Sequence, residues 1–173
     1  EDYAAANTLA QRMQGPYVQS YLPLGNLYLT FALPPTTEPE QYYRDLSLDQ
    51  ALATTRFQVE GITYTRVVFA SYPDQIIALR FSASHPGSLS FMARLDSELR
   101  HSVTPGGSDT LILKGQAPVN VEPSFRDDVS NPIVYDYHDG MRCELHLRVL
   151  ADDGTITVNA NDLRVTQASA VTL

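Results

Sequence analysis

The strongest constraint on the fold is an alternation of apolar and polar residues that runs from residue 51 to residue 95 with few interruptions. Two alternating segments, Leu52 to Val59 and Ile62 to Ala70, are separated only by Glu60 and Gly61. A two-residue connection between alternating segments is typical of a tight β-hairpin. The sequence therefore predicts antiparallel strands at the centre of the chain.

The turn also sets the predicted register of this hairpin. Val59 faces Ile62 and Phe57 faces Tyr64, so one face of the hairpin is apolar. Side chains at the intervening positions are mostly polar and are expected to face water. At the far end of the second strand residues 67–69 are all apolar, so we expect both faces of the sheet to be covered there.

The rest of the chain divides into a helix, further strands and two polar stretches. A helix is predicted over residues 2–14, where an Ala-rich segment is followed by Gly15 and Pro16. Residues 98–109 are polar, and residues 115–132 contain three prolines and no sustained period, which predicts a long irregular loop. Further strands are predicted at residues 26–33, 42–48, 77–83, 89–95, 111–114, 133–137, 142–149, 155–159, 163–167 and 170–173.

About ten strands and one short helix predict an all-β fold, a super-sandwich of two antiparallel sheets with one short N-terminal α-helix. A turn at residues 152–154 is expected to fold residues 155–159 back onto the strand at residues 142–149. The chain has 173 residues, of which 43% are hydrophobic, and this is enough to build one core. We therefore expect a single domain over residues 1–173.

Composition argues against several classes of partner. The formal net charge is -8 and the 12 Lys and Arg residues are scattered, so binding to nucleic acid is not expected. No apolar run approaches the roughly 20 residues that cross a bilayer, so no membrane partner is expected. Cys143 is the only cysteine, and no internal disulfide can form. No phosphate-binding glycine loop or His-Glu-x-x-His motif occurs, and neither a cofactor nor a metal is expected.

The predicted irregular loop holds the most suggestive polar residues. Inverting glycoside hydrolysis needs one carboxylic acid and one carboxylate base, with roughly 6.5 to 9.5 Å between them. Carboxylates that are close in sequence on an irregular loop are rarely held at such a separation. A structural loop, or one that docks against another domain, is the favoured interpretation. The candidate residues are Asn120, Glu122, Arg126, Asp127 and Asp128.

Two other groups of residues invite a chemical role. Cys143 and His146 are three residues apart on a predicted strand and so lie on opposite faces, which argues against a shared metal ion. His138 lies close to Asp136 and Asp139 and could join a metal or acid–base site. A hairpin tip rich in polar residues is the simpler interpretation of that cluster.

The ten tyrosines could provide a surface on which sugar rings stack. Tyr28, Tyr64 and Tyr135 fall at strand positions, however, where half-buried packing is the ordinary role of an aromatic side chain. The chain has no Trp, which also argues against a sugar-binding platform.

Several blocks of the sequence occur in the order found in one enzyme family. Tyr21 to Leu27 resembles the Pro-Leu-Gly-Asp-Leu element of that family, with Asn26 in place of the commoner Asp. Tyr43 to Asp49 resembles its Arg-x-Leu-Asp-Leu strand, with Ser47 departing from the usual Asp. The other matching blocks lie at residues 61–66, 69–77, 116–118, 132–135 and 140–142. Together they resemble the N-terminal β-sandwich of family 95 glycoside hydrolases, the inverting α-L-fucosidases.

This resemblance implies a function for a longer parent protein. Family 95 enzymes remove terminal α-1,2-linked fucose, or in some members α-L-galactose, with a Glu as general acid and an Asp, helped by Asn, activating the water. Those groups belong to an (α/α)6 helical barrel that follows the sandwich. Nothing from Glu1 to Leu173 resembles that barrel, so we expect this chain to be an inactive fragment. Its expected partner is the barrel domain, and the parent's substrate is a fucosylated glycan.

Two alternatives from other classes stay open. A free-standing carbohydrate-binding module would bind fucosylated glycans on its own, and an adhesin-like structural sandwich would have a flat surface without a ligand. The sequence leaves the location of the parent open, with a secreted or periplasmic one favoured. The flanking sequence of the parent would separate these interpretations.

Overall fold

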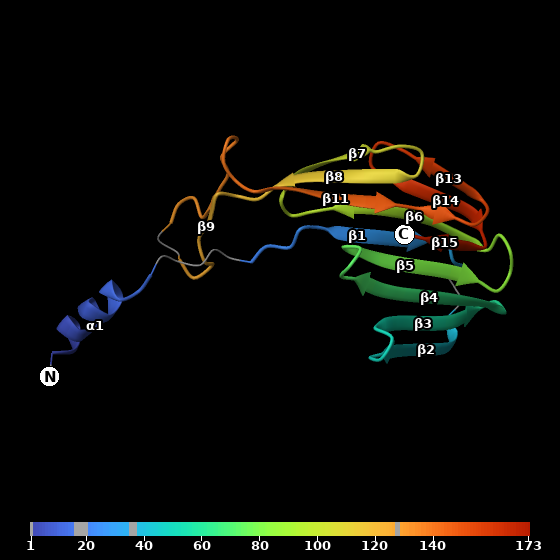
Figure 1. The fold of residues 1–173 in the computed structure, drawn as a ribbon, viewed down its shortest axis with the longest axis horizontal. Helices are drawn as coiled ribbons and strands as arrows, with labels where there is room; N and C mark the ends of the chain where they lie inside the picture. The colour runs from blue at the N-terminus through green and yellow to red at the C-terminus, as the bar shows by residue number, and fades with distance from the viewer. Residues whose placement is uncertain (1, 16–20, 35–37, 127–128) are drawn as a thin grey trace. The chain divides into compact units, whose positions relative to one another are not determined.

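The computed structural model describes residues 2–15, 21–34, 38–126 and 129–173 (Figure 1). The chain forms two compact units, a smaller one from residues 1–23 and 117–141 and a larger one from residues 24–116 and 142–173. The larger unit contains all but two of the strands in the described part of the chain.

The smaller unit begins with helix α1 (Tyr3–Arg12). The Asp2 carboxylate caps this helix by accepting a hydrogen bond from the Ala5 backbone N–H at 3.0 Å. All residues of α1 are exposed, so the helix depends on its alanine content and its cap. The prediction of a short N-terminal helix is confirmed.

The prediction of an irregular loop over residues 115–132 is only partly right. Within it β9 (Asn120–Val121) forms a two-stranded ladder with β10 (Ile133–Val134), in which Ile133 pairs with Val121. The Glu122 backbone N–H extends the pairing by donating to the Pro132 carbonyl at 2.8 Å. The strand predicted at residues 133–137 is accordingly reduced to two residues.

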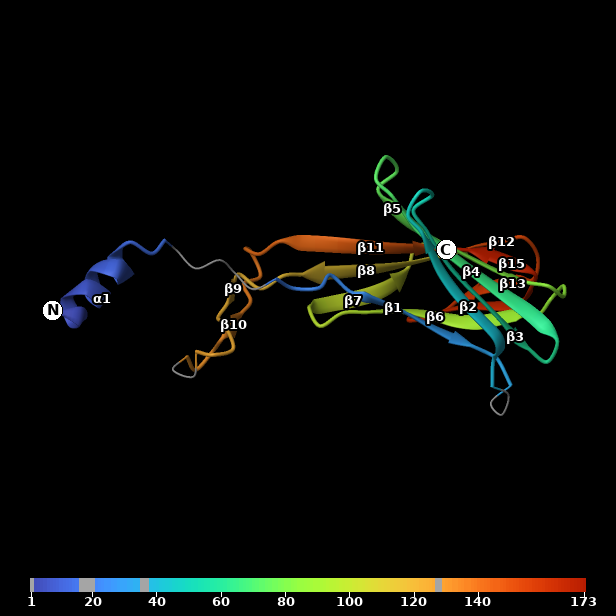
Figure 2. The same cartoon turned by 90° about the horizontal axis from the view of Figure 1, so that it is seen from below.

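Three antiparallel sheets make up the larger unit (Figure 1). The six-stranded sheet has the order β12 (Leu150–Ala151), β15 (Ala170–Thr172), β5 (Ile76–Ala83), β4 (Ile62–Ser71), β3 (Leu52–Val59), β2 (Glu40–Ser47). The four-stranded sheet has the order β1 (Asn26–Phe31), β6 (Leu89–Asp96), β14 (Leu163–Ala168), β13 (Thr155–Val158). The three-stranded sheet has the order β11 (Arg142–Arg148), β8 (Thr110–Gln116), β7 (Arg100–Pro105). Figure 2 shows the strands of the six-stranded sheet running obliquely to those of the other two.

The central hairpin has the predicted register. Val59 pairs with Ile62 and Phe57 with Tyr64 across β3 and β4. Glu60 and Gly61 both have positive φ, at 50° and 78°, as a two-residue turn matched to the twist of the strands requires. The local sequence therefore determines this part of the sheet.

One hydrophobic core joins the sheets of the larger unit. Phe81 on β5 packs against Phe31 on β1 and Phe91 on β6, with ring centroids 5.3 and 5.9 Å away. Leu111, Leu113 and other side chains of the three-stranded sheet belong to the same buried cluster. The prediction of an all-β sandwich with one short helix is confirmed.

Two local predictions are wrong and a third is only partly right. The polar stretch 98–109 contains strand β7, which pairs with β8. Backbone hydrogen bonds to β8 hold this strand, although Val103 is its only large aliphatic residue. Strand β13 pairs with β14 and not with β11, since the turn at residues 152–154 carries the chain from the six-stranded to the four-stranded sheet. The expected cover over both faces at residues 67–69 is incomplete, since Val67 and Val68 are half-buried and Phe69 is 40% exposed.

Candidate functional site

The predicted loop residues form a small polar cluster in the smaller unit. The Asn120 side-chain amide donates to Glu122 Oε1 at 3.1 Å, and Arg126 Nη1 lies 3.5 Å from Glu122 Oε2. Both oxygens of the one carboxylate are therefore engaged by neighbours from the same loop. Asp127 and Asp128 lie outside the described residues.

This cluster has the character of a loop clamp. An amide and a guanidinium from the same loop hold this carboxylate in place. Asn120, Glu122 and Arg126 also supply a single carboxyl group, whereas glycoside hydrolysis uses two. The geometry accordingly favours the structural interpretation of these three residues.

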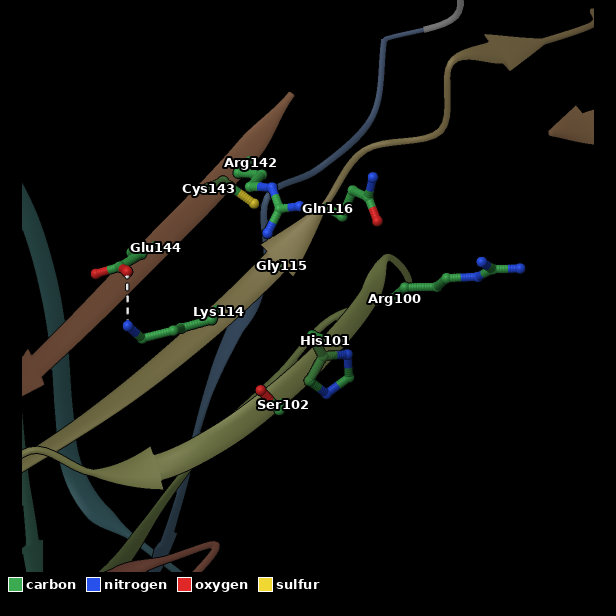
Figure 3. A pocket seen from close by; sticks show the side chains of 9 residues that line it. All are labelled: Arg100, His101, Ser102, Lys114, Gly115, Gln116, Arg142, Cys143 and Glu144. Atoms are coloured by element: carbon green, nitrogen blue, oxygen red, sulfur yellow. Dashed lines mark ion pairs between the residues drawn. The ribbon is translucent and has the colours of Figure 1, made fainter. Parts of the chain in front are cut away.

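A surface depression of about 510 Å³ lies on the three-stranded sheet (Figure 3). Pairing across β7, β8 and β11 brings together three rows of residues from distant parts of the sequence. The middle row has Gly115 at its centre, between His101 and Cys143, and a Cβ at Gly115 would lie 2.9 Å from Cys143 Sγ. The depression is lined by Arg100, His101, Ser102, Lys114, Gly115, Gln116, Arg142, Cys143 and Glu144.

The charges around this depression are mixed. Lys114 Nζ lies 3.0 Å from Glu144 Oε1, as the dashed line in Figure 3 marks. A hydrogen bond with His146, and then one with Lys114, lowers the pKa of the Glu144 carboxyl. His101 is also engaged, with Nδ1 2.8 Å from the Leu99 carbonyl oxygen and Nε2 3.5 Å from Asp96 Oδ1. These contacts hold the sheet edge together and define no catalytic pair.

No pattern along the chain predicts this depression, because its walls come from three strands. Arg100 and Arg142 meet Gln116 only through the register of β7, β8 and β11. A row formed by pairing across strands is invisible to any pattern read along one strand.

The histidine candidates have local structural partners. His146 is exposed and its Nε2 lies 2.7 Å from Glu144 Oε2, while Cys143 is half-buried on the other face of β11. Asp136 Oδ1 accepts the backbone N–H of His138 at 2.7 Å and that of Asp139 at 3.3 Å, which is a turn built by an Asp side chain. Within the described ranges no group of three or more His, Cys, Asp or Glu residues is placed to hold a metal ion.

The tyrosine candidates divide by burial. Tyr64 is buried and stacks on Phe57 at 5.5 Å between ring centroids, and burial raises the pKa of its phenol. Tyr28 is exposed, but the Arg94 guanidinium lies over its ring at 5.3 Å. Tyr135 is half-buried in the smaller unit. Within the larger unit, Tyr64 and Tyr28 are thus each engaged by a neighbouring side chain.

No helix among the described residues has the length and apolar character needed to cross a membrane.

Residues 1–173 match the family model described as glycosyl hydrolase family 65, N-terminal domain. The protein named alpha-L-fucosidase 2 from Arabidopsis thaliana is 33% identical over 160 residues, which cover 88% of this chain and 19% of that relative. The chain therefore corresponds to about a fifth of the length of this relative.

Proposed function

Because the chain belongs to the glycosyl hydrolase family 65 N-terminal domain family, we propose that it serves an α-L-fucosidase as its non-catalytic N-terminal β-sandwich. The parent reaction is the inverting removal of terminal α-1,2-linked L-fucose from glycans, as in family 95. The chain itself supplies no acid or base to this reaction.

The similarity to the Arabidopsis fucosidase is the observation that carries this proposal. A match of 33% identity over 88% of the chain agrees with the order of the sequence blocks, from the Leu22-Pro23-Leu24-Gly25-Asn26 segment to Gly140-Met141-Arg142. A non-catalytic role also agrees with the local contacts among the candidate residues Asn120, Glu122 and Arg126. The proposed partner is a helical-barrel catalytic domain in the same polypeptide, and that domain binds the glycan.

The proposal is tested by assaying the 173-residue chain and a full-length polypeptide that contains it. On an α-1,2-fucosylated galactoside, the full-length protein should release β-L-fucose, the anomer that inversion produces, and the short chain should release none. Proton NMR of the first product identifies the anomer. Hydrolysis by the short chain, or a full-length protein that cleaves only other glycosides, would overturn the proposal.

Binding by the isolated chain separates this role from that of a carbohydrate-binding module. Isothermal titration of the 173-residue chain with the same fucosylated galactoside should give no heat of binding. A saturable heat would instead favour the free-standing module.

We also propose that the loop carrying Glu122 reaches the rim of the parent's active site. Replacing Glu122, Asp127 and Asp128 together with Ala in the full-length protein should raise KM for the fucosylated substrate. The exposed Glu98→Ala variant is the matched control and should leave the kinetics unchanged. Unchanged kinetics in the triple variant would remove the loop from the active-site rim.

A further inference from the structure

The six-stranded sheet carries an uninterrupted apolar row on the face that builds the core. Leu46 pairs with Ala53, Ala53 with Val68, and Val68 with Leu79. Leu79 and Leu173 exchange backbone hydrogen bonds of 3.0 and 2.8 Å, which places Leu173 next in the same row. We call these five residues, together with Ala70 and Ile77 in the adjacent row, the apolar stripe.

Strand alternation places the apolar stripe on the same face as the core. Val68 is four residues from buried Tyr64, and Leu79 is two residues from buried Phe81, so both side chains point to the core side of the sheet. Leu79 and Leu173 pack partly against the core cluster. The stripe is thus a continuation of the core surface.

The outer part of the apolar stripe is open to solvent in this chain. Leu46 is 63% exposed and Ile77 is 68% exposed, and Ala53 and Ala70 are exposed as well. Contiguous apolar surface of this kind marks a site of interaction with another protein surface.

The opposite face of the same strands has a different character. Next to the stripe, its row reads Asp45, Thr54, Val67, Arg80 and Thr172. Arg80 is committed there, with Nη2 2.6 Å from Asp152 Oδ2 and Nη1 2.9 Å from Thr172 Oγ1. This row is more polar than the apolar stripe, and the next row on the same face holds the apolar pair Phe69 and Ala78.

We infer that the apolar stripe is the docking surface for the catalytic part of the parent polypeptide, an inference that rests on the function proposed above. The fucosidase relative is about five times as long as the region it shares with this chain, since that region is 19% of its length. In a protein of that length, the remaining four fifths would supply the apolar side chains that cover this continuation of the core.

Hydroxyl-radical footprinting tests this assignment by measuring side-chain exposure directly. Leu46 and Ile77 should be oxidised severalfold less in the full-length protein than in the 173-residue chain. Ile76 is the matched control, because it is 52% exposed and lies on the opposite face of the same strand. Equal oxidation of Leu46 and Ile77 in the two proteins would overturn the docking surface.

A pair of variants in the full-length protein provides the second test. Ile77→Asp buries a charge in the proposed interface, and calorimetry should show the transition of this domain separating from that of the rest. Ile76→Asp should leave the wild-type transition in place. Equal effects of the two variants would exclude the stripe as the docking face.

These outcomes are distinguishable from failure of the proposed function. Protection of Leu46 and Ile77 in a parent that does not cleave fucosides would uphold the docking surface and remove the fucosidase assignment. Full exposure of both residues in an active fucosidase would do the reverse.

Discussion

The two ends of one face of the six-stranded sheet have the same apolar character and opposite surroundings. At one end Phe57, Tyr64 and Phe81 are at most 7% exposed. At the other end Leu46 and Ile77 are 63% and 68% exposed. Alternation along a strand therefore specifies which face is apolar. Whether that face is buried depends on the element that packs against it.

The covered end owes its burial to strands from another sheet. Phe31 and Phe91 of the four-stranded sheet pack on Phe81, and the turn at residues 152–154 carries the chain from β12 in one sheet to β13 in the other. The exposed end extends past this contact. Truncating side chains at the two ends should therefore have very different effects on the stability of the isolated chain.

The largest effect is expected from Phe81→Ala. Removing a ring that is 3% exposed leaves a cavity and should lower the free energy of unfolding by about 3–5 kcal/mol. Ile77→Ala at the exposed end is the control, with a change within about 0.5 kcal/mol. Urea denaturation followed by tyrosine fluorescence measures the unfolding free energy of both variants. Equal losses would contradict the difference in burial between Phe81 and Ile77.

Gly154→Ala should weaken the connection that closes the covered end. Gly154 has φ +80°, and a Cβ there would lie 2.5 Å from the Thr166 carbonyl oxygen, so we expect a loss of about 2–3 kcal/mol. Gly61→Ala separates the two causes, because Gly61 has φ +78° with nothing within 4 Å and should lose only about 1 kcal/mol. Thermal melts compare the two variants, and similar shifts in Tm would show that the clash is unimportant.

Arg66 marks the border between the covered end and the apolar stripe. Its guanidinium lies 4.5 Å from the Phe31 ring centroid and 5.1 Å from that of Phe57, and burial lowers its pKa. Arg66→Ala should cost about 1–2 kcal/mol through lost packing and cation–π attraction. Arg56→Ala removes an exposed arginine near Tyr43 and should change the unfolding free energy by less than about 0.5 kcal/mol. An equal loss in both variants would contradict this difference.

The smallest expected effect is a pH dependence of stability that arises at the turn formed by residues 152–154. Both the Ser169 hydroxyl and the Ser169 backbone N–H donate to the Asp153 carboxylate, and these bonds lower the pKa of Asp153 below its ordinary value of 3.8. The stabilisation is therefore present above that value and is lost as the pH falls through the lower pKa of the folded state.

Asp153→Asn should consequently flatten the fall in Tm on acidification below pH about 4. Ser169→Ala removes the hydroxyl donor and should flatten it less, because the backbone donor remains. Melts recorded at a series of acidic pH values measure the slope, and a slope unchanged from wild type in Asp153→Asn would exclude the contribution.

Much of the fold follows from local sequence because the signals are local. The Glu60–Gly61 turn fixed the register of β3 and β4, and the Ala-rich segment with its Asp2 cap fixed α1. Strand β7 was not predicted because its residues do not alternate between apolar and polar. Every residue of β7 except Val103 is exposed. A strand of this kind is held by pairing with β8, which the sequence of β7 alone cannot report.

The candidate sites show the same division. The clustering of Asn120, Glu122 and Arg126 was foreseeable, since the three lie within one loop. The depression around Gly115 was not, since it needs three strands in register.

The alternation of apolar and polar residues is enough to specify antiparallel sheets with one strongly apolar face, because side chains alternate along a strand whatever surrounds it. Which stretch of that face is enclosed depends on how the sheets pack together. The enclosed stretch is the one that meets the four-stranded sheet, since burial depends on residues that are distant in sequence. Leu46 and Ile77, at the other end of that face, are 63% and 68% exposed in the described part of this chain.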